Sequence, residues 1–209
     1  MKEKILAEAE RLFWKYGVRT ITMDDIARRL AISKKTIYQH FTDKEDIVYQ
    51  VVEWHMTHEQ NDYCRLKEKE LNPIEEIVLA SNMMRQHADK VNPSLLLDVQ
   101  RYFPKAWEVF LKHKENHITK DLIDNLQRGV EQGLYRADFD IETMARLRIE
   151  LIQLGFDERV FPHQRDVYTT QDQLLDHYIR GILSERGLSI YEALKTKVNE
   201  YNLSIYENK

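Results

Sequence analysis

Residues 22–41, TMDDIARRLAISKKTIYQHF, have the pattern of two short helices separated by a tight turn. Thr22 and Ser33 are favourable N-cap residues, and each directly precedes a helical pattern. Apolar residues recur about one turn apart within each helix, at Ile26, Leu30, Ile37 and Phe41. With only a short segment between the two helices, this spacing predicts a helix-turn-helix.

The second of these helices carries many hydrogen-bonding and cationic side chains. If Ile37 and Phe41 point inward, the outward set comes from Lys34, Lys35, Thr36, Tyr38, Gln39 and His40. Lysine can contact guanine acceptors or phosphates, glutamine can pair with adenine, and hydroxyls often bind phosphates. The helix N-terminus itself favours an anion. Either this is an ordinary amphipathic helix with a solvated face, or the face reads DNA.

One further helix is expected before this motif and one after it. Residues 2–17 have apolar residues at helical spacing and end at Gly17, a natural left-handed stop. Thr42 or Asp43 caps a helix that starts near Lys44 and runs into the sixties. The small core of the three N-terminal helices would contain Leu12, Phe13, Ile26, Leu30, Ile37 and Phe41.

The rest of the chain also has helical patterns, without internal repeats or useful strand alternation. We expect helices over 73–91, 93–103, 104–131, 141–155 and 171–186, with 156–170 as a loop. Asparagine–proline pairs open the first two, and Gly187 would end the last. The predicted fold is all-α. Its predicted domains are a helix-turn-helix domain over 1–46, a helical ligand-binding and dimerisation domain over 47–187, and a partly helical tail over 188–209.

Composition agrees with a helical protein. The 209 residues include only 6 glycines and 4 prolines, which leaves few tight turns. Residues 1–50 carry ten basic and eight acidic side chains, a net charge of +2. Since the whole chain has a net charge of −4, residues 51–209 carry −6. The bias permits a local cationic face.

Without an N-terminal apolar run or roughly 18 consecutive apolar residues, we expect a cytoplasmic protein. The single cysteine, Cys64, is expected to be buried or half-buried.

Residues 5–47 resemble the N-terminal domain of TetR/AcrR-type transcriptional regulators. The matching features are an A…LF…G…T…T…IA frame, then S-K-x-T-[LI]-Y-x-H-F, then K-E-x-[IL] at the start of the fourth helix. The family is all-helical and dimeric, and it binds palindromic operators, usually as a repressor that a small-molecule ligand releases. The resemblance implies three partners, namely double-stranded DNA, a second copy of the chain and an unknown effector. It implies no cofactor, no membrane and no enzyme activity.

The resemblance also implies DNA contacts by position, at Thr22, Ser33, Lys34, Lys35, Thr36, Tyr38, Gln39, His40 and Lys44. Two residues depart from the family pattern. Ala31 stands where the turn usually begins with glycine, and a positive φ there costs on the order of 1 kcal/mol. Lys35 also replaces a usual glycine, so a long cation takes the place of a close backbone approach. We therefore expect an operator that differs from those of better-matching relatives.

Beyond residue 50 the candidates rest on side-chain chemistry alone. We predict that a ligand cavity is lined by some of Trp54, Met84, His87, Phe103 and Trp107. The alternative is that these side chains simply pack in the core. The pairs His55/His58 and His113/His117 have spacings that can bind a metal. Because no third ligand is fixed by spacing, we predict no metal site.

Two late segments, 141–154 and 174–183, are apolar on more than one face and must be buried on more than one side. One side can face the domain core, and the resemblance assigns the other to a symmetric dimer interface. Two alternative functions stay open. One is a helical protein–protein interaction domain whose helix-turn-helix does not bind an operator. The other is a small helical enzyme, although no phosphate loop, nucleophile elbow or zinc-enzyme helix occurs.

Overall fold

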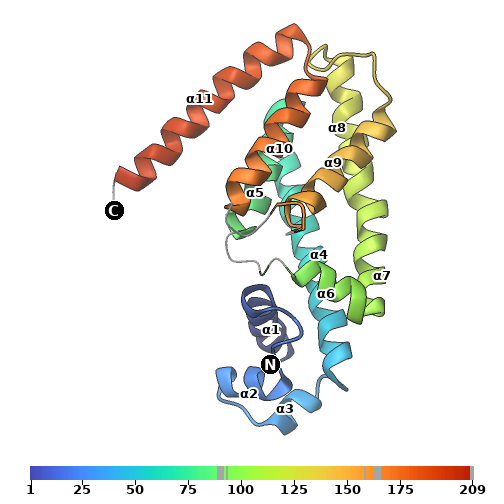
Figure 1. Cartoon of the computed structure of the whole chain (residues 1–209), viewed down its shortest axis with the longest axis vertical. Helices are drawn as coiled ribbons and strands as arrows, with labels where there is room; N and C mark the ends of the chain where they lie inside the picture. The colour runs from blue at the N-terminus through green and yellow to red at the C-terminus, as the bar shows by residue number, and fades with distance from the viewer. Residues whose placement is uncertain (89–91, 93, 158, 162–165, 208–209) are drawn as a thin grey trace.

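The computed structural model describes residues 1–88, 92, 94–157, 159–161 and 166–207, with the backbone alone at 85–88 and 197–207. All regular elements in these ranges are helices, as predicted, and the one isolated β-bridge joins Tyr135 to Leu183. Figure 1 shows an elongated molecule with α1, α2 and α3 at one end and a larger bundle above them. Within the described ranges, no helix is long and apolar enough to cross a membrane.

The N-terminal helices follow the predicted caps. Their bounds are α1 Lys2–Tyr16, α2 Met23–Leu30, α3 Lys34–Tyr38 and α4 Lys44–Lys67. Thr22 and Asp25 form a reciprocal capping box at the start of α2. Ser33 caps α3 by accepting the Thr36 amide, and Asp43, rather than Thr42, caps α4. Ala31 adopts the left-handed conformation with φ of 53°, the conformation for which the family turn uses glycine.

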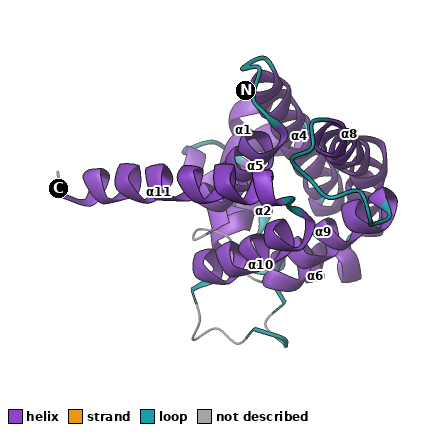
Figure 2. Ribbon diagram, turned by 90° about the horizontal axis from the view of Figure 1, so that it is seen from above, coloured by secondary structure: helices purple, strands orange, loops and turns teal. Residues whose placement is uncertain are grey.

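The larger bundle contains the remaining helices. They are α5 Pro73–Ala88, α6 Leu95–Tyr102, α7 Pro104–His113, the π-helix η1 Lys114–Ile118, α8 Thr119–Glu131, α9 Ile141–Gly155, α10 Val167–Ile182 and α11 Glu185–Glu207. The predicted starts after Asn72 and Asp140 are confirmed, since both side chains accept amide hydrogen bonds from the first turn that follows. Figure 2 shows α11 extending away from the other helices.

Two helix starts differ from the prediction, and one predicted helix is interrupted. The helix predicted from residue 93 begins at Leu95 because the Asn92 side chain accepts the Ser94 amide at 3.0 Å and forms a turn instead; Pro93 lies outside the described residues. The helix predicted over 104–131 contains the π-turn η1, where the Thr119 hydroxyl donates to the Lys114 carbonyl at 2.9 Å. The helix predicted from residue 171 begins at Val167, because Asp166 caps it.

Gly187 does not end a helix. α10 ends at Ile182, and Gly187 lies in the first turn of α11. A Cβ atom at Gly187 would lie 2.0 Å from the carbonyl oxygen of Leu134. The residue is therefore a glycine because two segments approach closely there. The tail from Gly187 continues as helix to Glu207, further than the partly helical tail predicted.

Two apolar cores stabilise the chain. The first contains the predicted set, with Leu12, Phe13, Ile26, Ile37 and Phe41 buried and Leu30 packed against them. It also contains buried residues from the bundle, namely Leu95, Val99 and Ala106 of α6 and α7. The second core joins α5, α8, α9, α10 and the start of α11. The helices around the helix-turn-helix therefore share one core with α6 and α7.

Candidate nucleic-acid interface

The short helix α3 is anchored by its apolar side and exposes the other. Ile37 has no exposed surface, and Phe41 is buried beside it, so both point into the first core. On the other side, Tyr38 is 46% exposed, and Lys34, Lys35 and Gln39 are exposed as well. Thr36 and His40 are half-buried at the edge of this face. The structure thus places the six polar residues of the predicted set around one outward surface.

The hydroxyl groups of the predicted set already have roles in the fold. The Ser33 hydroxyl lies 2.8 Å from the Thr36 hydroxyl and accepts the Thr36 amide at 3.1 Å. The Thr22 hydroxyl donates to Asp25 at 2.6 Å. All three residues remain at the surface at the starts of α2 and α3. Their hydroxyl oxygens lie at helix N-termini, where phosphate groups are favoured.

Lys44 is held at the start of α4 near a second cation. Its ammonium donates to the Arg19 carbonyl at 3.0 Å. Burial and the nearby Arg19 guanidinium lower the pKa of Lys44. The Arg19 guanidinium lies 4.5 Å from the centre of the Tyr102 ring at the end of α6. A half-buried ammonium beside a guanidinium favours an anion such as a phosphate.

Asp24 was not among the predicted DNA contacts. The sequence indicates only that it is a negatively charged residue in the first turn of α2. In the structure its carboxylate lies 3.0 Å from the Lys34 ammonium, across the turn of the motif. Asp24 therefore belongs to the same outward surface as the start of α3. The only signal for this in the sequence is that the two residues occupy the first turns of the two helices of the motif.

The predicted ligand set is not gathered around one cavity. Trp54, Phe103 and Trp107 pack against the first apolar core, and Met84 is half-buried on α5. The side chain of His87 lies outside the described residues. Of the four that are described, Trp107 lines a groove. The core-packing alternative therefore accounts for Trp54 and Phe103.

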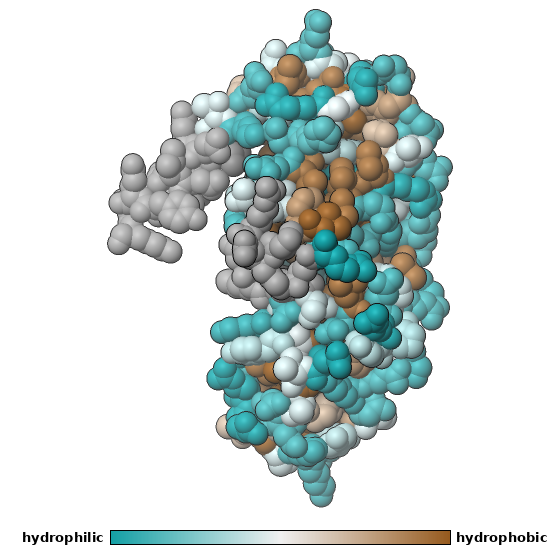
Figure 3. All heavy atoms as spheres, in the orientation of Figure 1, coloured by the Kyte–Doolittle hydropathy of each residue, from teal (hydrophilic) through white to brown (hydrophobic). Residues whose placement is uncertain are grey.

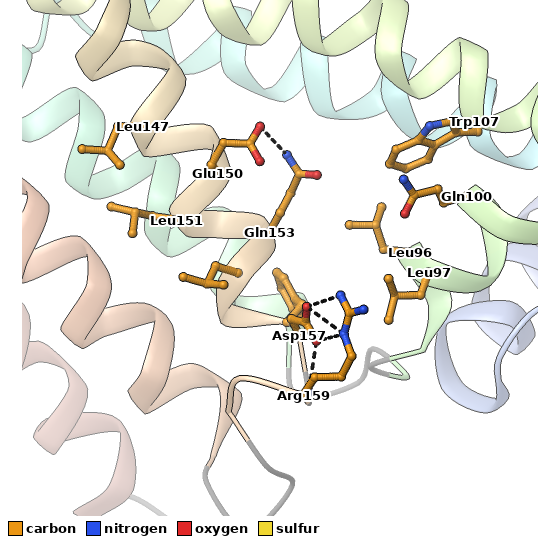
Figure 4. A pocket seen from close by; sticks show the side chains of 12 residues that line it. Leu96, Leu97, Gln100, Trp107, Leu147, Glu150, Leu151, Gln153, Asp157 and Arg159 are labelled. Atoms are coloured by element: carbon orange, nitrogen blue, oxygen red, sulfur yellow. Dashed lines mark hydrogen bonds and ion pairs between the residues drawn. The ribbon is translucent and has the colours of Figure 1, made fainter.

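The groove beside Trp107 has a volume of about 340 Å³ and lies between α6, α7 and α9. Figure 4 shows Leu96, Leu97 and Trp107 on one side and Leu147 and Leu151 on the other. In Figure 3 apolar side chains gather on the face of the molecule that carries α9. The volume of the groove lies at the lower end of the range of small-molecule sites, and its lining also includes the charged residues Glu150, Asp157 and Arg159.

The histidines have partners of other kinds. Nδ1 of His55 lies 2.7 Å from Glu10, and the rings of His113 and His117 stack with centres 4.9 Å apart. Among the described residues, no group of three or more His, Cys, Asp or Glu side chains could hold a metal ion. Cys64 is exposed, so the expectation of burial was wrong. It lies on the outer side of α4, while Leu66 points inward.

Comparison with known proteins agrees with this geometry. Residues 5–51 match the family model described as "Bacterial regulatory proteins, tetR family". The HTH-type transcriptional regulator YvaF of Bacillus subtilis is 30% identical over 118 residues, which cover 54% of this chain and 62% of that protein. The HTH-type transcriptional repressor KstR2 of Mycobacterium tuberculosis is 24% identical over 146 residues, which cover 68% of this chain and 73% of that protein.

The fold beyond the matched region is also similar to solved structures. A transcriptional regulator from Saccharomonospora viridis, solved in complex with choline, superposes with a TM-score of 0.75 at 20% identity. The superposition covers 88% of this chain and 98% of that chain, so it includes both the helix-turn-helix and the bundle. Residues 5–51 therefore belong to the tetR family of bacterial regulatory proteins, and the rest of the chain has the fold of this solved structure.

Proposed function

We propose that this protein binds a palindromic operator in double-stranded DNA as a homodimer, represses transcription, and is released by a small-molecule effector. The observation that carries the proposal is the outward face of α3, which is anchored by the buried Ile37 and exposes the predicted DNA contacts. In helix-turn-helix proteins the second helix lies in the major groove. A cytoplasmic location follows from the proposed access to DNA.

The outer faces of α9 and α10 support a dimer. Leu147 of α9 is 42% exposed, and Leu154, two turns further along the same helix, is exposed as well. Both also line the groove between α6, α7 and α9, so in this proposal the groove opens beside the dimer interface. Apart from the backbone and neighbours of its own helix, no heavy atom in the described part of the chain lies within 4 Å of where a Cβ of Gly181 would be, so a second helix could approach closely. A symmetric dimer places two recognition helices in successive major grooves, which is the reason that such operators are palindromic.

The groove between α6, α7 and α9 supports the effector part of the proposal. Its α6 wall belongs to a helix whose Leu95 and Val99 pack in the same core as the helix-turn-helix. A ligand that binds two arrangements of α6 with different affinity would shift the equilibrium between them. In this proposal residues 1–46 read DNA, residues 47–187 hold the effector and the second copy, and residues 188–209 form a C-terminal tail. The choline complex of the Saccharomonospora protein shows that a relative of this fold takes a small ligand.

The test is selection of DNA from a random pool by the purified protein, followed by sequencing and by binding measurements over a range of salt. We expect an enriched palindrome and an affinity that falls steeply with salt, because bound phosphates release counterions. No enrichment at any salt concentration would favour the alternative of a helical protein–protein interaction domain.

A further inference from the structure

Asp24 and Lys34 form an ion pair that joins the two helices of the helix-turn-helix. Asp24 lies in the first turn of α2, and Lys34 is the first residue of α3. The ammonium nitrogen is 3.0 Å from the carboxylate, and the Asp24 and Lys34 side chains are 56% and 50% exposed. The pair therefore lies on the outer surface of the motif, next to the exposed Lys35.

The pair presents a hydrogen-bond donor directly beside an acceptor. A G·C base pair presents the complementary pattern in the major groove, with guanine O6 and N7 as acceptors and cytosine N4 as a donor. Lysine binds the guanine acceptors, and aspartate accepts from cytosine N4. An A·T pair also offers a donor, adenine N6, but it places only one acceptor on either side of that donor, so a lysine cannot bind two adjacent acceptors there as it can at guanine N7 and O6. Because Asp24 and Lys34 already lie 3.0 Å apart, the two contacts would fall within one base pair.

We propose that Asp24 and Lys34 act together to read one G·C base pair in each operator half-site, with Lys34 donating to guanine and Asp24 accepting from cytosine. This rests on the proposed function, since it requires α3 to lie in the major groove. Asp24 is then a specificity-determining residue, although it belongs to the first helix of the motif and carries the charge that DNA repels.

A different role for Asp24 would be simple repulsion of the DNA backbone. Phosphate contacts carry no direct sequence information. A carboxylate that only repels phosphates would therefore lower the affinity for all DNA, and its removal would strengthen binding everywhere. A carboxylate that reads cytosine acts at a single position of the site. Sequence preference thus separates the two roles.

The experiment repeats the random-pool selection with the wild-type protein, Asp24→Ala and Asp138→Ala. Asp138 is the matched control, because it is an exposed aspartate paired with Arg136 on the loop after α8. We expect the wild type and Asp138→Ala to enrich the same palindrome with one invariant G·C pair in each half-site. We expect Asp24→Ala to keep the palindrome and lose about 10-fold of the preference at that pair.

A second variant exchanges the charges, with Asp24→Lys and Lys34→Asp in one chain. We expect guanine and cytosine to change strands at the same position of the half-site. Both positions are exposed, and thermal melting verifies that the variants fold. Unchanged preference in Asp24→Ala, or uniformly tighter binding to all sequences, would overturn the G·C reading while leaving the regulator in place. Absence of any palindrome with the wild type would instead overturn the proposed function.

Discussion

Nδ1 of His55 on α4 lies 2.7 Å from a carboxylate oxygen of Glu10 on α1. Nε2 of the same ring lies 3.4 Å from Glu59, so the imidazole is placed between two carboxylates. Burial opposes the charged ring, but the hydrogen bonds to Glu10 and Glu59 outweigh it and raise the pKa of His55 to about 9. A charged histidine therefore links the first helix of the DNA-binding end to α4.

This link predicts a loss of stability at alkaline pH. The pKa of His55 is raised from 6.5 in the unfolded chain to about 9 in the fold. The stabilisation is therefore complete below about pH 6.5 and is lost as the pH rises through 9. Its upper limit is about 3 kcal/mol in the free energy of unfolding. Urea denaturation at pH 6.5 and 9.5 measures it in the wild type and in His55→Gln.

His58→Gln is the control, because His58 is exposed on the same helix. We expect the control to keep the wild-type pH dependence and His55→Gln to lose most of it. If the free energy of unfolding changed by the same amount between pH 6.5 and 9.5 in all three proteins, the Glu10–His55 contact would add nothing to stability.

Lys44→Ala should weaken binding to every DNA sequence by a similar factor. The Lys44 ammonium is held at the start of α4 near Arg19, where we propose a phosphate contact. The logarithm of the DNA-binding constant falls with the logarithm of the salt concentration, and the loss of one phosphate contact makes this slope shallower by about 0.9. Titration of operator and random DNA at several salt concentrations measures this, with Lys105→Ala on α7 as the control. A loss confined to the operator would argue against a phosphate contact.

Gln39→Ala should change sequence preference instead. The Gln39 side chain is exposed at the end of α3, and glutamine can pair with adenine. We expect a loss of about 10-fold on the operator and little change on random DNA. Competition between the two DNAs provides the measurement. Equal losses on both would show that Gln39 does not read a base.

Leu147→Glu should dissociate the proposed dimer. The leucine is exposed on α9, and an unpaired charge in an interface weakens association by roughly 100-fold or more. Sedimentation at micromolar concentration compares it with Leu111→Glu, which changes an equally exposed leucine on α7. A wild type that sediments as a monomer, or a Leu147→Glu variant that stays dimeric, would remove α9 from the interface.

Gly187→Ala should destabilise the folded chain by about 1–3 kcal/mol, because a Cβ would collide with the Leu134 carbonyl. Ser189→Ala, at an exposed position two residues further on, should have little effect. Denaturation of the two variants gives the comparison. Equal stabilities would show that the contact between Gly187 and Leu134 can open at no cost.

The sequence predicts the features that depend on neighbouring residues. The caps at Thr22, Ser33 and Asp140 are local hydrogen bonds, and the burial of Ile37 follows from helical periodicity. Two local signals were missed, the Asn92 turn and the Asp166 cap, and another prediction failed where distant segments meet. The role of Gly187 depends on Leu134, fifty-three residues earlier in the chain, and no local pattern records that contact.

The candidate site also has parts that the sequence predicts and parts that it does not. The outward residues of α3 could be predicted from the spacing of two apolar residues, because the helix determines which way each side chain points. The Asp24–Lys34 pair could not, because it depends on the angle between two helices. The predicted ligand set failed to converge for a related reason. Aromatic spacing identifies a buried face of α4 or α7 but does not tell a core from a cavity.

The first apolar core also bears on how such regulators can be recombined. Leu95, Val99 and Ala106 pack among the residues that support the helix-turn-helix. A chimera cut after α4 would remove these side chains and leave apolar surface of α1 and α4 open to water. A transfer of helices α1–α4 to another regulator would therefore have to include α6 and the start of α7. Otherwise the acceptor protein would have to supply matching side chains at those three positions.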